Sequence, residues 1–171
     1  DQFYTRPEIA AQCVQNLTKF ISFDDYDIIL EPSAGEGAIL DYLPLSKRQG
    51  IDIDPKRADI LNRDFFTYIP PKGRILVVGN PPFGTQSSLA VRFFNHASIF
   101  ADTIAFIIPI IWKKWSLQKR IDINYRLIYS EVIPKESFIF EGSPYKVSCL
   151  FQIWTKRVDI LPEIDLRIRN V

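Results

Sequence analysis

The sequence predicts an α/β fold: a mostly parallel, doubly wound sheet with an antiparallel hairpin at one edge. Six apolar runs rich in Ile, Val and Phe are bounded by turn residues, at 26–30, 50–53, 75–78, 103–108, 126–133 and 147–154. Their apolar character is continuous, which is typical of strands covered on both faces. Helix-like stretches separate the early runs, at 7–20, 37–42, 55–61 and 87–100. This alternation favours parallel strands joined by right-handed crossovers, whereas the last two runs lack a clear intervening helix and indicate the hairpin.

The composition indicates one domain with a substantial core, because 47% of the 171 residues are hydrophobic. The formal net charge is only +1, so any nucleic-acid contact must be a local patch. Cys13 and Cys149 lie far apart without CxxC spacing, which favours buried thiols over a disulfide framework or a zinc site. The polar start and the short apolar run at 104–112 exclude a signal peptide and a membrane span. We expect a soluble intracellular protein that needs no metal.

The loop EPSAGEG follows the first strand and opens a helix. Gly35 and Gly37 permit a close approach of backbone to a ligand, and the helix start offers unpaired N–H groups. Glu31 and a second glutamate make the loop acidic, which disfavours a pyrophosphate. A ligand with a cationic centre fits better, such as a sulfonium cofactor that carries an amino acid tail and an adenosine. Ser33 belongs to the same expected contact loop, and a plain strand-to-helix turn is the alternative interpretation.

The second strand ends in GIDIDP, where a carboxylate would lie beside the ribose hydroxyls of an adenosine ligand. We assign that role to Asp52, with Ile53 against the same ligand; a solvated strand-end acid is the alternative. Asp54 precedes a proline, so we expect it to be the N-cap of the helix at 55–61. Further along, Asp64 would accept a hydrogen bond from the adenine amino group, and Phe65 would pack against the adenine ring.

The turn Asn80-Pro81-Pro82-Phe83 directly follows a buried strand and indicates one chemistry, the transfer of a methyl group to a planar amine. The lone pair of such an amine is delocalised into its ring, and two acceptors that pull on its hydrogens localise the pair. The side-chain oxygen of Asn80 and the backbone carbonyl of Pro81 would supply them. The two prolines set both carbonyl directions before substrate arrives, and Phe83 then stacks on the base. An ordinary turn after a strand is the alternative.

Taken in order, these motifs resemble those of class I S-adenosylmethionine-dependent amino methyltransferases, over roughly residues 3–155. The version with Phe83 resembles the branch that acts on adenine N6 in DNA or RNA. The resemblance implies a Rossmann-like fold, S-adenosylmethionine as the cofactor and a nucleic-acid substrate. The segment YTRPEI is similar to the one that closes over the methionine part of the cofactor. It implies that Tyr4 contacts the cofactor and that Thr5 and Pro7 lie near its carboxylate end.

The resemblance implies one methyltransferase domain over 1–171, with a cofactor-closing segment at 1–20, a catalytic core at 21–157 and a tail at 158–171. The chain departs from the family pattern at residues 53–63, which are too few for a helix and a full third strand, so that edge is abbreviated or residues are missing. Little chain follows residue 154 to form a recognition domain. We therefore expect a partner chain or a further domain to supply sequence selectivity.

Contacts to the target are expected at two places. Paired cations beside tryptophan suit phosphate contact and base stacking, and Trp112, Lys113 and Lys114 form such a group. The alternative is a helix start whose tryptophans face the core and whose lysines are solvated. The loop at 141–146 is expected to join the last two strands, and relatives hold the flipped base with an aromatic residue near it. The candidates there are Phe138, Phe140, Tyr145 and Lys146.

Three rival functions stay open: methylation of a protein glutamine amide, methylation of cytosine N4, and an inactive cofactor-binding subunit that helps a partner hold RNA. Glutamine modification more often goes with Tyr at the position of Phe83, and an intact catalytic turn disfavours the inactive subunit. The only histidine, His96, is expected to have a structural or surface role. We expect Asn80→Ala to lower turnover far more than cofactor affinity, and Asp52→Ala to do the reverse.

Overall fold

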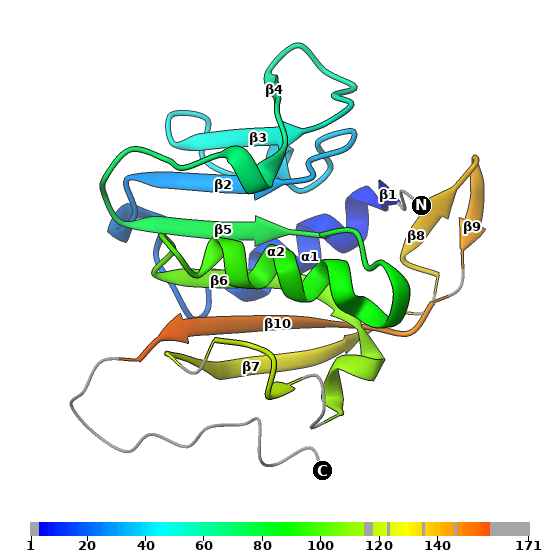
Figure 1. The fold of residues 1–171 in the computed structure, drawn as a ribbon. Coiled ribbons are helices and arrows are strands. Elements are labelled where there is room, and N and C mark those ends of the chain that lie inside the picture. The colour runs from blue at the N-terminus through cyan, green and yellow to red at the C-terminus, as the bar shows by residue number, and fades with distance from the viewer. Residues whose placement is uncertain (1–3, 115–117, 123, 135, 146, 158–171) are drawn as a thin grey trace.

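The chain forms one large sheet with a small sheet beside it (Figure 1). The computed structural model describes residues 4–114, 118–122, 124–134, 136–145 and 147–157. The strands are β1 (Tyr4–Thr5), β2 (Ile28–Pro32), β3 (Arg48–Asp52), β4 (Ile60–Asn62), β5 (Ile75–Gly79), β6 (Thr103–Pro109), β7 (Tyr125–Ile133), β8 (Phe138–Phe140), β9 (Ser143–Tyr145) and β10 (Cys149–Lys156). In the described residues, the large sheet has the order β4-β3-β2-β5-β6-β10-β7 and the small one the order β1-β8-β9.

Strand directions confirm the predicted α/β class. β2 runs parallel to β3 and β5, and the parallel pairing continues to β4 on one side and to β6 on the other. β10 is antiparallel to both of its neighbours, β6 and β7. The sheet is therefore mostly parallel, with the expected antiparallel pair at one edge.

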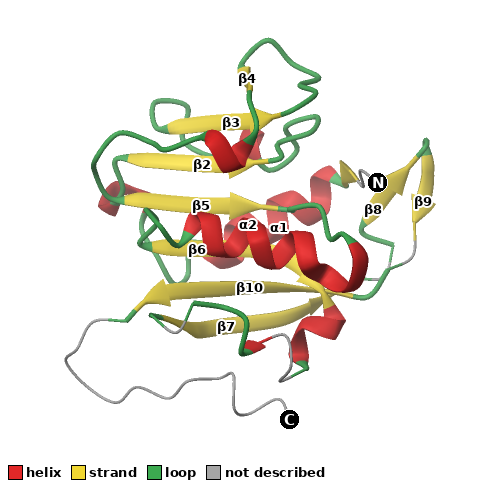
Figure 2. Ribbon diagram, in the orientation of Figure 1, coloured by secondary structure: helices red, strands yellow, loops and turns green. Residues whose placement is uncertain are grey.

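Helices cover both faces of the large sheet (Figure 2). The α-helices are α1 (Pro7–Leu17) and α2 (Ser88–Ala97), and the short 3-10 helices are η1 (Phe23–Asp25), η2 (Leu40–Tyr42), η3 (Phe65–Thr67), η4 (Thr85–Ser87) and η5 (Ile110–Lys113). α1 begins with a proline, whose missing N–H costs nothing at a helix start. α1 and α2 both end three residues before the predicted bounds.

Alternate residues of each central strand build the core on the two faces. In β5, Leu76 and Val78 pack on the side of α1, whereas Ile75 and Val77 pack on the side of α2. All five residues of β5 are buried. This two-sided burial explains the continuous apolar runs in the sequence.

Two predicted helices are wrong, and both lie at the β3–β4 edge. Residues 37–42 form only η2, because Gly37 adopts a left-handed φ of 81° and Pro44 disfavours helical geometry in the residue before it. Residues 55–59 form a turn that leads into β4, which begins at Ile60. Ile60 and Leu61 pair with Gly50 and Ile51 of β3 and so cannot continue a helix. Asp54 therefore caps no helix; its backbone N–H donates instead to Asp52 Oδ1 at 2.9 Å.

Residues 138–145 correct a second expectation. They do not form a simple loop between the last two strands but build the hairpin of β8 and β9, and β8 pairs with β1. Thr5 lies opposite Phe138 in this pairing, and the N–H of Arg6 donates to the carbonyl of Ser137 at 2.9 Å. The N-terminal segment is thereby fixed beside the carboxyl ends of β2 and β5. Among the described helices, none is long and apolar enough to cross a bilayer.

Candidate active site

The candidate site lies where the carboxyl ends of β2 and β5 meet. β2 lies between β3 and β5. The chain passes from β2 to β3 in one direction along the sheet and from β5 to β6 in the other, so the two connections leave a crevice between them. Ligand sites in doubly wound sheets usually lie at such a point. A cleft of about 550 Å³, open solvent included, occupies this position. It is lined by Tyr4, Thr5, Glu31, Ser33, Ala34, Gly35, Glu36, Ala38, Ile39, Asn80, Pro81 and Pro82. The acidic glycine loop and the turn at Asn80 therefore line one cleft.

The catalytic turn is a direct extension of β5. Asn80 is half-buried and Pro81 is buried. The amide nitrogen Nδ2 of Asn80 donates to Thr5 Oγ1 at 3.2 Å, although 75 positions separate the two residues. Phe83 is half-buried and packs against the core on the α1 side. The turn thus combines fixed main-chain geometry with an amide held from the N-terminal segment.

The glycine loop bends sharply after β2. Ser33 and Gly35 both adopt left-handed φ values of 58°, which is a strained conformation for the serine. The N–H of Gly35 donates to Asp52 Oδ2 at 2.8 Å. The ring of Tyr4 lies over Gly35, because a Cβ built at that glycine would be 3.2 Å from it. A side chain at position 35 would therefore meet both strain and a ring.

Glu31 is the most unusual carboxylate of the site. It lines the cleft yet is only 3% exposed, and its Oε2 atom has no hydrogen-bond partner among the described residues. Burial raises the pKa of Glu31 well above its usual value, and the nearby carboxylates of Asp41 and Asp52 add to this effect. A hydrogen bond from the backbone of Leu40 offsets part of the pKa shift, but a buried carboxylate oxygen that lacks a partner is costly unless a ligand supplies one. The site therefore fits a ligand with a cationic group.

Asp52 lies beneath the loop rather than on the cleft wall. It is 2% exposed, and its two oxygens accept the backbone N–H groups of Gly35 and Asp54. This contact fixes the glycine loop, a role that the strand-end position alone did not indicate. Ile53 follows it with 72% of its surface exposed.

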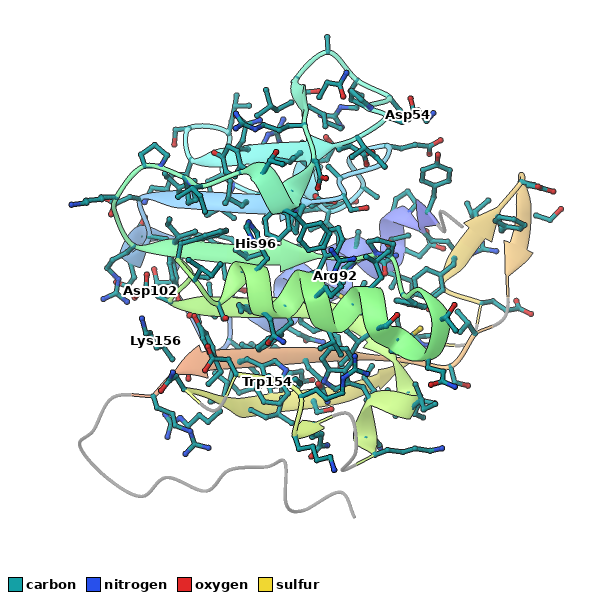
Figure 3. The ribbon with its side chains drawn as sticks, viewed as in Figure 1. Asp54, Arg92, His96, Asp102, Trp154 and Lys156 are labelled. Atoms are coloured by element: carbon teal, nitrogen blue, oxygen red, sulfur yellow. The ribbon has the colours of Figure 1, made fainter. Side chains whose placement is uncertain are left out.

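Asp64 and Phe65 also lie outside the cleft lining. Asp64 is exposed and caps η3, where its Oδ1 accepts the N–H of Phe66 at 2.9 Å. Phe65 is buried and stacks on Phe93 of α2, with ring centroids 5.3 Å apart. His96 closes this aromatic cluster on the front face of the sheet (Figure 3), and its Nε2 lies 2.9 Å from the carbonyl oxygen of Tyr68. These contacts give the histidine the expected structural role.

Sequence reasoning missed Arg57. Its guanidinium donates to Asp41 and to both oxygens of Asp59, and it contacts the carbonyl of Glu36 in the glycine loop. The residue was assigned to a helix, so no signal in the sequence placed it against the loop. The contact between Arg57 and the glycine loop joins two separate segments of the chain and is seen only in the structure.

The residues expected to contact the target differ in how far they are exposed. Trp112 has no exposed surface and packs in the core against Phe94 of α2, so it presents no face to a base. It is the only buried residue of η5, because its large apolar ring turns inward while Ile110 and Ile111 stay exposed. Phe138 is likewise fully buried, whereas Phe140 is half-buried. Lys113 is half-buried and Lys114 is exposed.

For some of the other residues expected to have a role, the structure gives no side-chain position. Tyr145 belongs to β9, and its side chain is not described. Lys146 and the tail at 158–171 lie outside the described residues. Pro7 is exposed at the start of α1. Within the described part of the chain, no cluster of three His, Cys, Asp or Glu side chains is arranged to hold a metal.

No family model and no curated protein matches the sequence. The fold, in contrast, matches solved structures. A candidate RNA methyltransferase of Pyrococcus horikoshii has a TM-score of 0.68 at 15% identity, over 92% of this chain and 88% of that one. The 23S rRNA methyltransferase ErmE has a TM-score of 0.63 at 17% identity, over 97% and 75%. A dimethyladenosine transferase of Plasmodium falciparum has a TM-score of 0.56 at 16% identity, over 91% and 64%.

At these identities the similarity concerns the fold and not the substrate. Structures with the same fold also include a methyltransferase named for magnesium protoporphyrin IX. The mostly parallel seven-stranded sheet with its antiparallel edge, formed by the described residues, matches these structures over most of the chain. The chain therefore has the Rossmann-like fold of class I methyltransferases.

Proposed function

We propose that this chain is an S-adenosylmethionine-dependent methyltransferase that modifies the N6 amine of adenine in nucleic acid. One observation carries the proposal: the turn at Asn80 and the acidic glycine loop line the same cleft. The first has the acceptors that an aromatic amine needs, and the second suits a cationic ligand. Proteins of the same fold named for RNA or for dimethyladenosine support a nucleic-acid substrate.

The residues of the cleft fit S-adenosylmethionine, which supplies an electrophilic methyl group on a sulfonium sulfur. The buried Oε2 of Glu31 suits the cationic amino group of the cofactor. Tyr4, Thr5 and Ser33 line the same part of the cleft, next to the backbone of Gly35. The remaining cofactor contacts expected from the sequence, at Pro7, Gly37, Asp52, Ile53, Asp64 and Phe65, stay predictions, because none of these residues lines the cleft.

The catalytic turn is assigned to the target amine. Asn80 Oδ1 and the carbonyl oxygen of Pro81 accept its two hydrogens and localise the lone pair, so the nitrogen becomes the nucleophile. Pro82 keeps Pro81 extended, and Phe83 stacks on the base. The proton that the methylated nitrogen sheds passes to water, because its acidity removes the need for a strong base.

Target contacts are assigned to the hairpin of β8 and β9 and to the end of β6. β1 lines the cleft and pairs with β8, so the hairpin stands beside the cleft. Phe140, Tyr145 and Lys146 are the candidates on this side. Lys113 and Lys114 follow β6 and are assigned to phosphate contact.

The test is a methyl-transfer assay with labelled S-adenosylmethionine and three acceptors: RNA, DNA and protein. We expect label on a nucleic acid with the wild-type chain, and labelling that is about 10²- to 10³-fold slower with Asn80→Ala. Label on protein glutamine would assign the turn to an amide substrate instead. Absence of any transfer from a chain that still binds the cofactor would favour the inactive subunit.

A further inference from the structure

Arg57 lies in the connection between β3 and β4 and links three segments at the site. Its Nε and Nη2 atoms donate to the two carboxylate oxygens of Asp59 at 2.9 and 2.6 Å. Its Nη1 atom donates to Asp41 Oδ1 at 2.6 Å and lies 3.4 Å from the carbonyl oxygen of Glu36. Asp41 belongs to η2 and Glu36 to the glycine loop. One side chain therefore ties the loop to the segments on either side of β3.

The guanidinium lies directly on the backbone of Gly37. A Cβ built at this glycine would be 2.3 Å from Arg57 Nη1, which is closer than real atoms approach. The φ of Gly37 is 81°, a conformation that favours glycine. Position 37 is thus restricted twice, by its own backbone and by the arginine.

The loop needs such support because no α-helix follows it. Where a long helix continues a glycine loop, its hydrogen-bond ladder holds the end of the loop. Here η2 is three residues long, and it is reached through the bonds from Gly37 N–H to Ala34 and from Asp41 N–H to Gly37. A planar guanidinium that bonds two carboxylates supplies fixed geometry in place of that ladder.

We propose that Arg57 is a positioning residue for cofactor binding: it holds residues 36 and 37 so that the glycine loop keeps the shape that the cofactor meets. This inference rests on the proposed function, because it names the cofactor of the same cleft. Arg57 does not line the cleft itself, so it acts through the loop.

The direction in which ligand affinity changes when Arg57 is removed distinguishes a positioning role from an electrostatic one. S-adenosylmethionine carries a net positive charge at neutral pH, and a nearby arginine repels it. If Arg57 acted only through its field, its removal would tighten S-adenosylmethionine and leave the neutral product S-adenosylhomocysteine almost unchanged. A positioning role predicts that both ligands bind more weakly, by the same factor.

The experiment measures both dissociation constants by calorimetry for the wild type, Arg57→Gln and Arg63→Gln. Arg63 is the matched control, because it is an exposed arginine on the same edge whose side chain bonds Thr67 and no atom of the loop. We expect Arg57→Gln to weaken both ligands about 3- to 10-fold, a modest loss because Arg57 and its partners are partly exposed. Arg63→Gln should bind both ligands as the wild type does.

A second variant and a turnover measurement keep the test decisive if folding is disturbed. Arg57→Lys keeps the charge but loses the planar fork, so it should weaken binding as Arg57→Gln does. Turnover at saturating cofactor should stay within about 2-fold of the wild type, since the catalytic turn is untouched. Wild-type affinity in Arg57→Gln, or tighter S-adenosylmethionine alone, would overturn the inference while the proposed function stands. Failure of the wild type to bind either ligand would overturn both.

Discussion

The two halves of the cleft are held in place by different means. The catalytic turn is fixed by its own main chain, since the fully buried β5 leads straight into two prolines. The glycine loop is fixed from outside, by the carboxylate of Asp52 below it and by Arg57 on its far end. The chemistry is therefore encoded in a few consecutive residues, whereas the cofactor contact depends on contacts between distant segments. Mutations should separate the two halves accordingly.

Asn80→Ala should have the largest effect. It removes one of the two acceptors for the amine, so turnover should decrease about 10²- to 10³-fold, as for other lost transition-state hydrogen bonds. The dissociation constant of S-adenosylmethionine should stay within about 2-fold, because the loop does not change. Single-turnover rates and calorimetry on the same preparation check this. Equal losses in both quantities would contradict the division between the two halves.

Asp52→Ala should have the opposite profile. It leaves the buried N–H of Gly35 without its acceptor, so the free energy of unfolding should decrease by about 2–3 kcal/mol and cofactor affinity about 10-fold. Asp54→Ala is the matched control, because that carboxylate is exposed and its side chain bonds only Lys56 among the described residues. Thermal unfolding and calorimetry give the two readings. An Asp52→Ala protein as stable as Asp54→Ala would remove the role of Asp52 in the loop.

Glu31 predicts a pH dependence that belongs to the cofactor half alone. Its pKa is raised by burial, so the folded chain keeps a proton that the unfolded chain has released. Stability from this group is complete below the usual glutamate pKa of about 4.3 and is lost as pH rises toward the raised value. A cationic ligand prefers the ionised form, so cofactor affinity should increase with pH over the same interval and then level off.

Glu31→Gln keeps the shape of the side chain and removes its titration. Its cofactor affinity should be weaker and should not vary with pH over that interval, as measured by calorimetry at several pH values. An unchanged pH profile in Glu31→Gln would assign the titration to another group. Turnover at saturating cofactor should change less than affinity in this variant.

Thr5 should give the smallest effect, because it joins the halves through one hydrogen bond. Thr5→Val removes the acceptor for Asn80 Nδ2 without changing the size of the side chain, so turnover should decrease about 3- to 10-fold. Thr5→Ser keeps the hydroxyl and should retain most of the turnover. Steady-state kinetics at saturating cofactor compare the two variants. Similar losses in both would point to packing of β1 instead of the hydrogen bond.

The features that could be predicted from the sequence are those that depend on local patterns. Continuous apolar runs indicated the buried strands, and the turn at Asn80 was placed correctly because it follows such a run. The meeting of this turn with Glu31 and Gly35 follows from parallel strands whose carboxyl ends share one edge.

The predictions that were wrong concern features that depend on tertiary contacts. The stretch at 55–61 has helix-forming residues, but its end pairs with β3 as part of β4, and Arg57 bonds Asp59 within the turn before it. Trp112 was assigned to base stacking because it stands beside two lysines, yet its ring packs into the core, as the alternative interpretation had it. The pairing of β1 with β8 joins segments more than 130 positions apart, and no local pattern encodes it.

Nucleoside analysis of the methylated product is the decisive test of adenine-N6 methylation by this chain. RNA and DNA are incubated with the wild-type chain and S-adenosylmethionine, digested to nucleosides and analysed by mass spectrometry. We expect methyl groups on the N6 position of adenine with the wild type, and about 10²- to 10³-fold fewer with Asn80→Ala over the same time. Methyl groups on a carbon, on a ribose oxygen or only on protein would contradict it, because none of these acceptors is the aromatic amine that the turn at Asn80 and Pro81 is shaped to hold.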